Sequence, residues 1–153
     1  QVSITATFHF IREGAPGTFL CFFPAAGYPV HSSRGWGPHP PLRSFTASQG
    51  TNRLPFLQEK HRVSFPVTFF RETTMTIRYT APWQGVHGRG VFRYVLRSGG
   101  LWQGGRIGRL EIIVTNTSGR SVRLSPPYDR QRVFTDFRPR YDIEAMVIPE
   151  TGL

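Results

Sequence analysis

The feature that most limits what this chain can fold into is a hydrophobic alternation with a period of two. Every second side chain over residues 2–10 is apolar, namely Val2, Ile4, Ala6, Phe8 and Phe10. The same alternation recurs over residues 74–80, 110–115 and 141–147. Successive side chains of a strand point to opposite faces of its sheet. Each of these segments therefore predicts a β-strand with one buried face.

Glycine and proline narrow the fold class further. The 153 residues include 16 glycines and 13 prolines, and no window of eleven or more residues has convincing helical spacing. Strands joined by short connections without crossover helices predict an all-β fold, an antiparallel β-sandwich of the immunoglobulin-like type. The length suits one domain over residues 1–153. With 39% hydrophobic and 14% aromatic residues, the composition excludes a disordered chain.

Residues 25–51 depart from the alternation, because they contain four prolines and four glycines. We expect one long irregular loop here, inserted into the sandwich, and long ordered loops are often functional. Aromatic side chains on loops beside arginines can stack on sugars or bases. This loop and a second irregular segment, residues 82–90, supply the predicted binding residues Arg34, Trp36, Arg43, Trp83 and Arg89. The alternative is that the tryptophans only fill the ends of the sandwich.

Turn residues predict how some strands are connected. Residues 14–17, Gly-Ala-Pro-Gly, indicate a hairpin between the first two strands, and residues 71–73 indicate another. Pro66 interrupts the strand expected over residues 62–70. Proline donates no ladder hydrogen bond, so that strand should lie at a sheet edge or carry a bulge.

The charge balance is strongly basic. Lys and Arg number 19 against 9 Asp and Glu, which gives a net charge of +10. Such a surplus attracts anionic polymers, including nucleic acid, acidic lipid headgroups and wall polysaccharide. The arginines are scattered rather than gathered in a basic run, and Lys60 is the only lysine. A basic surface that is merely solvated is the alternative interpretation.

The sequence contains no motif typical of catalysis or of metal binding. It lacks a nucleophile elbow, a Walker loop and a dinucleotide-binding loop. The five histidines have no metal-ligand spacing. Asp142 and Glu144 lie among arginines, so surface salt bridges explain them, and Cys21 lies in an apolar run typical of a buried thiol. We expect no enzymatic activity, no metal and no cofactor. The longest apolar run, residues 19–23, is far shorter than the ~20 residues of a transmembrane helix.

One segment is more specific than composition. Residues 94–104, YVLRSGGLWQG, followed by Ile107-Gly108, resemble the Y-x-L-x-T-G-x-x-W-x-G-x-I-G segment of uncharacterised bacterial exported proteins. Residues 8–10, 22–24, 65–79 and 137–143 resemble other segments of that family. Gly105-Arg106 replaces a single family residue, and Arg12 stands where the family has asparagine. The resemblance implies a secreted or periplasmic cell-surface β-sandwich without established activity. Because Gln1 is not methionine, a signal peptide has been removed or the sequence is an excised piece.

Three hypotheses for function follow. The first is a non-catalytic, extracytoplasmic interaction or structural module of the cell envelope, which contacts other envelope proteins or anionic polymers. The second is a subunit of an extracellular filament or shell, assembled by exchange of the N-terminal strand through Val2, Ile4, Phe8 and Phe10. The third is a basic nucleic-acid-binding or coat protein, which would lose affinity steeply with salt.

Overall fold

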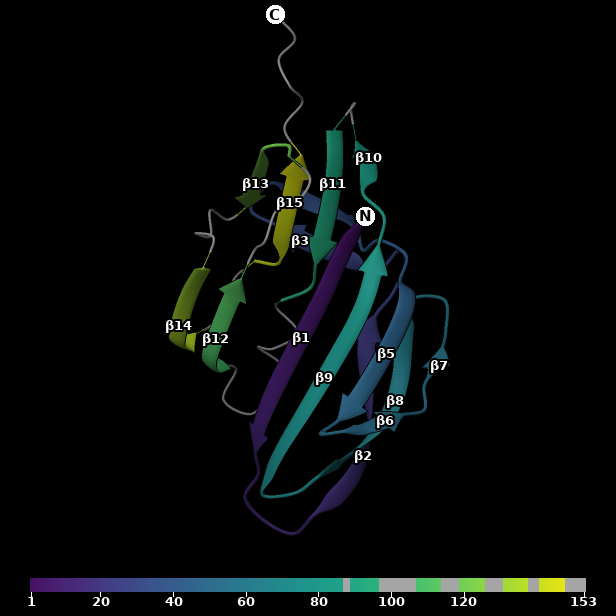
Figure 1. Cartoon of the computed structure of the whole chain (residues 1–153), viewed down its shortest axis with the longest axis vertical. Helices are drawn as coiled ribbons and strands as arrows, with labels where there is room; N and C mark the ends of the chain where they lie inside the picture. The colour runs from purple at the N-terminus through teal and green to yellow at the C-terminus, as the bar shows by residue number, and fades with distance from the viewer. Residues whose placement is uncertain (87–88, 97–106, 114–118, 126–130, 138–140, 148–153) are drawn as a thin grey trace, which may run out of the picture. The chain divides into compact units, whose positions relative to one another are not determined.

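Strands are the only regular elements in the computed structural model, which describes residues 1–86, 89–96, 107–113, 119–125, 131–137 and 141–147 (Figure 1). The pairings between the described strands are all antiparallel. The all-β, antiparallel prediction is therefore confirmed. The chain divides into two compact units. Unit 1 comprises Gln1–Tyr28 and Pro40–Pro82, and unit 2 comprises Pro29–His39 and Trp83–Leu153. The assignment of residues 1–153 to one domain stays a prediction.

Unit 1 contains two sheets. The first has the strand order β1-β9-β5-β6, and its strands are β1 (Val2–Ile11), β9 (Glu72–Ala81), β5 (Arg43–Gln49) and β6 (Asn52–Leu54). The second has the order β2-β8-β7, and its strands are β2 (Gly17–Pro24), β8 (Arg62–Phe69) and β7 (Leu57–Gln58).

Aromatic side chains join the two sheets of unit 1. The ring of Phe23 on β2 lies 5.4 Å from that of Tyr79 on β9 and 5.9 Å from that of Phe45 on β5, measured between centroids. The inner face of β9 is formed by every second residue, all buried: Thr73, Met75, Ile77, Tyr79 and Ala81. The alternation in the sequence therefore gives the buried face as predicted, and unit 1 is a two-sheet β-sandwich.

The connections predicted as hairpins join different sheets instead. Because β1 pairs with β9 and β2 pairs with β8, residues 12–16 and 70–71 both cross from one sheet to the other. The ladder continues around this corner, since Ile11 pairs with Glu72, the N–H of Arg12 donates to the carbonyl of Arg71 (2.9 Å), and Gly17 pairs with Phe69. The hairpin prediction was wrong because turn residues indicate that a chain reverses, not that the flanking strands pair.

Pro66 occupies a position where β8 has a partner on one side. It pairs with Leu20 of β2, whereas β7 pairs only with Val63 and Ser64 of β8. Among the described strands, none faces Pro66 from the side of β7, so the missing N–H removes no ladder bond there. The prediction that this strand lies at a sheet edge is therefore confirmed for the part of β8 around Pro66.

Cys21 on β2 is half-buried and forms no disulfide. Its burial raises the pKa of the thiol, which disfavours the thiolate at neutral pH. A structural, unreactive thiol therefore remains the better interpretation.

Unit 2 contains a four-stranded sheet, a strand pair and a hairpin. The sheet has the order β10-β11-β15-β13, and its strands are β10 (Gln84–Val86), β11 (Arg89–Tyr94), β15 (Ile143–Val147) and β13 (Val122–Ser125). The pair consists of β12 (Ile107–Ile113) and β14 (Gln131–Phe137), and the hairpin consists of β3 (Pro29–Ser32) and β4 (Gly35–Pro38). Strand β3 contacts both β11 and β15.

The long irregular loop expected over residues 25–51 is largely strand. It contains the hairpin β3–β4 and strand β5, whose Phe45 and Ala47 are buried. The prolines do not interrupt the hairpin, because Pro29 and Pro38 face each other as its outermost pair. Gly35, at a φ of 116°, follows the two-residue turn. Proline and glycine here mark strand ends and a turn rather than an irregular segment.

In the part of the chain that the structure describes, no helix is long and apolar enough to cross a membrane.

Candidate functional site

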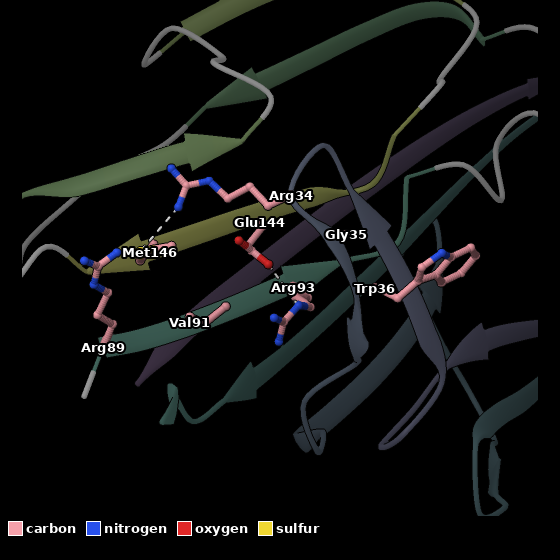
Figure 2. A pocket seen from close by; sticks show the side chains of 8 residues that line it. All are labelled: Arg34, Gly35, Trp36, Arg89, Val91, Arg93, Glu144 and Met146. Carbon is pink, nitrogen blue, oxygen red and sulfur yellow. Dashed lines mark hydrogen bonds and ion pairs between the residues drawn. The ribbon is translucent and has the colours of Figure 1, made fainter. Parts of the chain in front are cut away.

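Unit 2 contains a pocket of about 280 Å³ beside the hairpin β3–β4 and strands β11 and β15 (Figure 2). Its lining residues are Arg34, Gly35, Trp36, Arg89, Val91, Arg93, Glu144 and Met146. Three of the five predicted binding residues, Arg34, Trp36 and Arg89, are brought together here. The contacts of β3 with β11 and β15 place the hairpin next to the sheet.

The register between β11 and β15 positions most of the lining. Val91 pairs with Met146, and Arg93 pairs with Glu144. Side chains two residues apart on a strand share a face of the sheet. Arg89, Val91 and Arg93 from β11 therefore lie on the same face as Glu144 and Met146 from β15.

A buried ion pair forms one side of the pocket. The Nε of Arg93 lies 3.0 Å from the Oε2 of Glu144, and the two side chains are only 10% and 6% exposed. The N–H of that Nε is not aligned for a hydrogen bond, so the contact is one between charges. The Ser32 hydroxyl donates to the same Glu144 oxygen (3.5 Å), and Arg93 Nη1 donates to the Gln84 side-chain oxygen (3.5 Å). Glu144 is therefore already occupied by partners from β3 and β11.

The expectation of surface salt bridges for Asp142 and Glu144 was wrong about their exposure. Asp142 is 0% exposed and Glu144 is 4% exposed. Glu144 does contact an arginine, but this is the buried Arg93 rather than a neighbour in sequence. Arg138 and Arg140, which suggested the surface bridges, lie outside the described residues. Sequence proximity could not reveal the cross-strand partner.

Gly37 allows the guanidinium of Arg93 to lie against the hairpin backbone. A Cβ added at Gly37 would be 2.3 Å from both Cζ and Nε of Arg93. Real Cβ atoms do not approach other atoms so closely, so any larger residue would push the guanidinium away from Glu144. Glycine at this position serves a close approach between a backbone and a side chain.

Two further arginines converge on one sulfur atom. Nη1 of Arg34 lies 3.4 Å from the Sδ of Met146, and Nη1 of Arg89 lies 3.7 Å from the same atom (Figure 2). A thioether is a weak acceptor and carries no charge. Within the described residues, neither Arg34 nor Arg89 has a carboxylate partner. Three guanidinium groups against the single carboxylate of Glu144 leave the pocket with a surplus of positive charge.

Trp36 contributes to the pocket through its position on β4, while its ring lies elsewhere. Figure 2 shows the indole pointing away from Arg34, Arg89 and Arg93. The indole stacks on His31, with ring centroids 4.4 Å apart and an angle of 17° between the planes. The two faces of the hairpin therefore carry different chemistry, guanidinium groups on one and aromatic rings on the other.

The other two predicted binding residues do not line the pocket. Arg43 is the first residue of β5 in unit 1. Trp83 precedes β10 and is half-buried, with its side chain 3.4 Å from the position of a Cβ at Gly90. This placement of Trp83 favours the alternative in which the ring covers part of the fold. A binding role for these two residues stays a prediction.

The residues proposed for strand exchange lie in a strand that is already paired. β1 pairs with β9 over ten residues, from Val2 to Ile11. Val2, Ile4, Phe8 and Phe10 are half-buried on its inner face. Exchange between subunits would first require this ladder to open.

The sequence did not single out Arg93, Val91, Met146 or Glu144 as lining residues. A charged residue between Phe92 and Tyr94, in an otherwise apolar segment, was the available signal for Arg93. No comparable signal exists for Met146, whose role depends on the pairing of β15 with β11.

No group of three or more His, Cys, Asp or Glu side chains lies close enough to hold a metal ion, as far as the described residues go.

Tyr94, the last residue of β11, provides a prediction for alkaline pH. The residue as a whole is partly exposed, but its ionisable group is surrounded by protein, and this desolvation raises its pKa to about 12. Unfolded tyrosine ionises near ~10, so the folded state favours the neutral phenol. The stability that this contributes is complete below pH ~10 and is lost as the pH rises toward 12. In a titration of absorbance at 295 nm, Tyr94 should ionise at about 12, and Tyr94→Phe should remove its phase. An unchanged titration in the variant would contradict the assignment.

No family model, curated protein or solved structure matches this chain. The function of the site is therefore inferred from its own geometry.

Proposed function

We propose that this chain is a non-catalytic binding module that holds acidic groups of an extracellular polysaccharide in the pocket of unit 2. The observation that supports this proposal most is the convergence of Arg34 and Arg89 on the Met146 sulfur, with no carboxylate partner for either among the described residues. Residence outside the cytoplasm, on the bacterial cell surface, is part of the proposal and derives from the resemblance to exported proteins.

Guanidinium groups suit this task. Each presents a planar fork of N–H donors that matches a carboxylate, sulfate or phosphate group. The Arg93 guanidinium is neutralised by Glu144, so Arg34 and Arg89 are the groups available to a ligand. Buried Val91 and half-buried Met146 form an apolar part of the lining, which weakens competition from water.

The size of the pocket favours one group of a polymer over a whole small molecule. At about 280 Å³ it lies just below the ~300–1,000 Å³ typical of small-molecule sites. A polymer can supplement one weak contact with many, and the net charge of +10 attracts a polyanion over long range.

The lining argues for binding rather than catalysis. Its described residues include no histidine, cysteine or serine, and the one carboxylate among them, Glu144, contacts Arg93. A general base must be able to accept a proton from the substrate. Glu144 is held by an ion pair and by Ser32, so it is poorly suited to this role.

The test is calorimetric titration with dextran sulfate of wild-type protein and of the double variant Arg34→Ala/Arg89→Ala. Charge-assisted hydrogen bonds contribute about 1.5–3 kcal/mol each, so we expect at least about a tenfold loss of affinity. The control is Arg53→Ala/Arg78→Ala, which removes the same charge from exposed positions of unit 1. An equal loss in both variants would show that net charge, not the pocket, binds the polymer.

Nucleic acid is tested in the same experiment by adding single-stranded poly(dT). The proposal expects the polysaccharide to bind more tightly than poly(dT) at equal ionic strength. Tighter binding of poly(dT), with affinity falling steeply with salt, would favour a nucleic-acid-binding protein. A flat salt response with poly(dT) would eliminate that alternative.

A further inference from the structure

Three aromatic rings gather on the face of the β3–β4 hairpin opposite the arginines. His31 of β3 stacks on Trp36 of β4, its direct cross-strand partner. The ring of Tyr141 meets His31 edge-on, with centroids 5.5 Å apart and planes at 62°. We refer to His31, Trp36 and Tyr141 as the aromatic platform.

The platform is held by a buried carboxylate. The backbone N–H of His31 donates to Oδ2 of Asp142 (2.9 Å), and the N–H of Asp142 donates to the carbonyl of His31 (2.8 Å). The other carboxylate oxygen of Asp142 accepts the N–H of Leu96 (2.9 Å). Asp142 is 0% exposed, so these bonds are shielded from water. These bonds hold the backbone of His31, whose ring stacks on the indole of Trp36.

Two of the three residues of the platform are exposed to solvent. The Trp36 residue is 65% exposed and Tyr141 is 39% exposed. Tryptophan is usually well buried because its large apolar surface is unfavourable in water. An indole that stacks on a neighbouring ring and yet is exposed is typical of a surface that binds a partner, where aromatic area binds at little cost in conformational entropy.

We infer that the aromatic platform binds the apolar face of a sugar ring, so that the ligand is a carbohydrate chain. This inference rests on the proposed function, because the pocket on the other face of the same hairpin would hold the acidic group of another sugar further along the chain. The C–H groups of a pyranose ring pack flat on an indole, while its hydroxyl groups remain in water. Sugars separated along one chain can therefore contact both faces of the hairpin.

A nucleobase fits this arrangement less well. Phosphate contacts supply most of the affinity for nucleic acid, and a stacked base brings its own phosphate close to the ring. Figure 2 shows the Trp36 indole directed away from the guanidinium groups of Arg34, Arg89 and Arg93. A base stacked on Trp36 would therefore hold its phosphate away from these three groups. A polysaccharide can place a neutral sugar on the platform and an acidic sugar further along the chain in the pocket, so its stacked unit need not carry a charge.

The test uses a glycan array that presents neutral and acidic forms of each sugar type, with inorganic sulfate and poly(dT) as separate probes in solution. Trp36→Ala should lower affinity for the bound glycans at least tenfold, whereas Trp36→Phe should keep it within about threefold of wild type, since a ring remains. Affinity for inorganic sulfate should not change in Trp36→Ala. Because Trp36 is largely exposed, both variants should retain the wild-type melting temperature.

The outcomes separate this inference from the proposed function. If Arg34→Ala/Arg89→Ala lowers the affinity for acidic glycans but Trp36→Ala does not, the proposed anion site is supported and the inference about the aromatic platform is contradicted. If Trp36→Ala lowers the affinity for neutral glycans and the arginine variant leaves all affinities unchanged, the inference about the platform is supported and the proposed anion site is contradicted. Binding to no glycan on the array, or an equal loss of glycan and poly(dT) affinity in Trp36→Ala, would overturn the carbohydrate inference.

Discussion

Replacing Glu144 with methionine is expected to lower the free energy of unfolding of unit 2 by about 3–5 kcal/mol. The change leaves the guanidinium of Arg93, only 10% exposed, without its counter-charge. Removing one partner of a buried ion pair is strongly destabilising because the remaining charge stays desolvated. Urea denaturation followed by circular dichroism, with the slope and midpoint fitted for each variant, measures the difference.

The matched control is the double variant Arg93→Met/Glu144→Met. An apolar pair of similar volume is often as stable as the buried ion pair it replaces, so the double variant should recover most of the lost stability. Recovery would show that the loss in Glu144→Met comes from the unpaired charge of Arg93 rather than from the changed shape of the side chain at position 144. A change below about 1 kcal/mol in Glu144→Met would contradict the burial of the pair.

Deleting residues 1–10 is expected to unfold unit 1. The deletion removes nearly all of β1, which pairs with β9 along its whole length, and leaves only the Ile11–Glu72 pair of that ladder. It also removes the ring of Phe10, which meets that of Phe69 edge-on at 5.1 Å. We expect loss of the cooperative unfolding transition of this unit, measured by calorimetry and by protection of the β9 amides from hydrogen exchange.

This deletion also distinguishes the strand-exchange hypothesis. That hypothesis expects the truncated chain to stay folded and only to lose assembly. A milder pair of variants checks that β1 contributes through its inner face. Phe10→Ala should cost about 2 kcal/mol, less than the ~3–5 of a fully buried phenylalanine, and Ile11→Ala, at an 85% exposed position, less than about 0.5. A folded, monomeric deletion variant would contradict our expectation.

Alternation predicted the strands well because it reports directly on burial. Met75, Ile77 and Tyr79 are apolar at every second position and all face the core of unit 1. Which strands pair with each other was harder to predict from the sequence. The turn at residues 14–17 suggested that β1 and β2 pair with each other, but each pairs with a strand much further along the chain, β9 for β1 and β8 for β2. A turn sequence encodes local reversal, whereas the choice of partner depends on which sheet buries the apolar face.

Residues 25–51 show a second limit of prediction from the sequence. Its prolines and glycines predicted irregular structure, yet it forms a hairpin and a buried strand. Pro29 and Pro38 lie at the open end of the hairpin, and Gly37 makes room for a guanidinium. Glycine that permits a close approach cannot be distinguished by sequence from glycine that permits a turn.

The candidate site was predicted in part. Arg34, Trp36 and Arg89 stood out because arginines and tryptophans in Gly-rich segments are typical of binding surfaces. That the Trp36 indole faces away from both arginines follows from the alternation along β4, which the expectation of an irregular loop concealed. Met146 and Glu144 could not be predicted, because their place in the pocket is set by the cross-strand register of β15 with β11.

The most direct test of the anion-binding pocket is an NMR titration of the arginine side-chain Nε–Hε signals with dextran sulfate, with Arg34→Lys and Arg89→Lys providing the assignments. We expect the signals of Arg34 and Arg89 to shift together and to saturate at one ligand concentration, while those of Arg53 and Arg78 move little. Shifts of similar size at arginines throughout the chain, with no saturation at Arg34 and Arg89, would contradict the account.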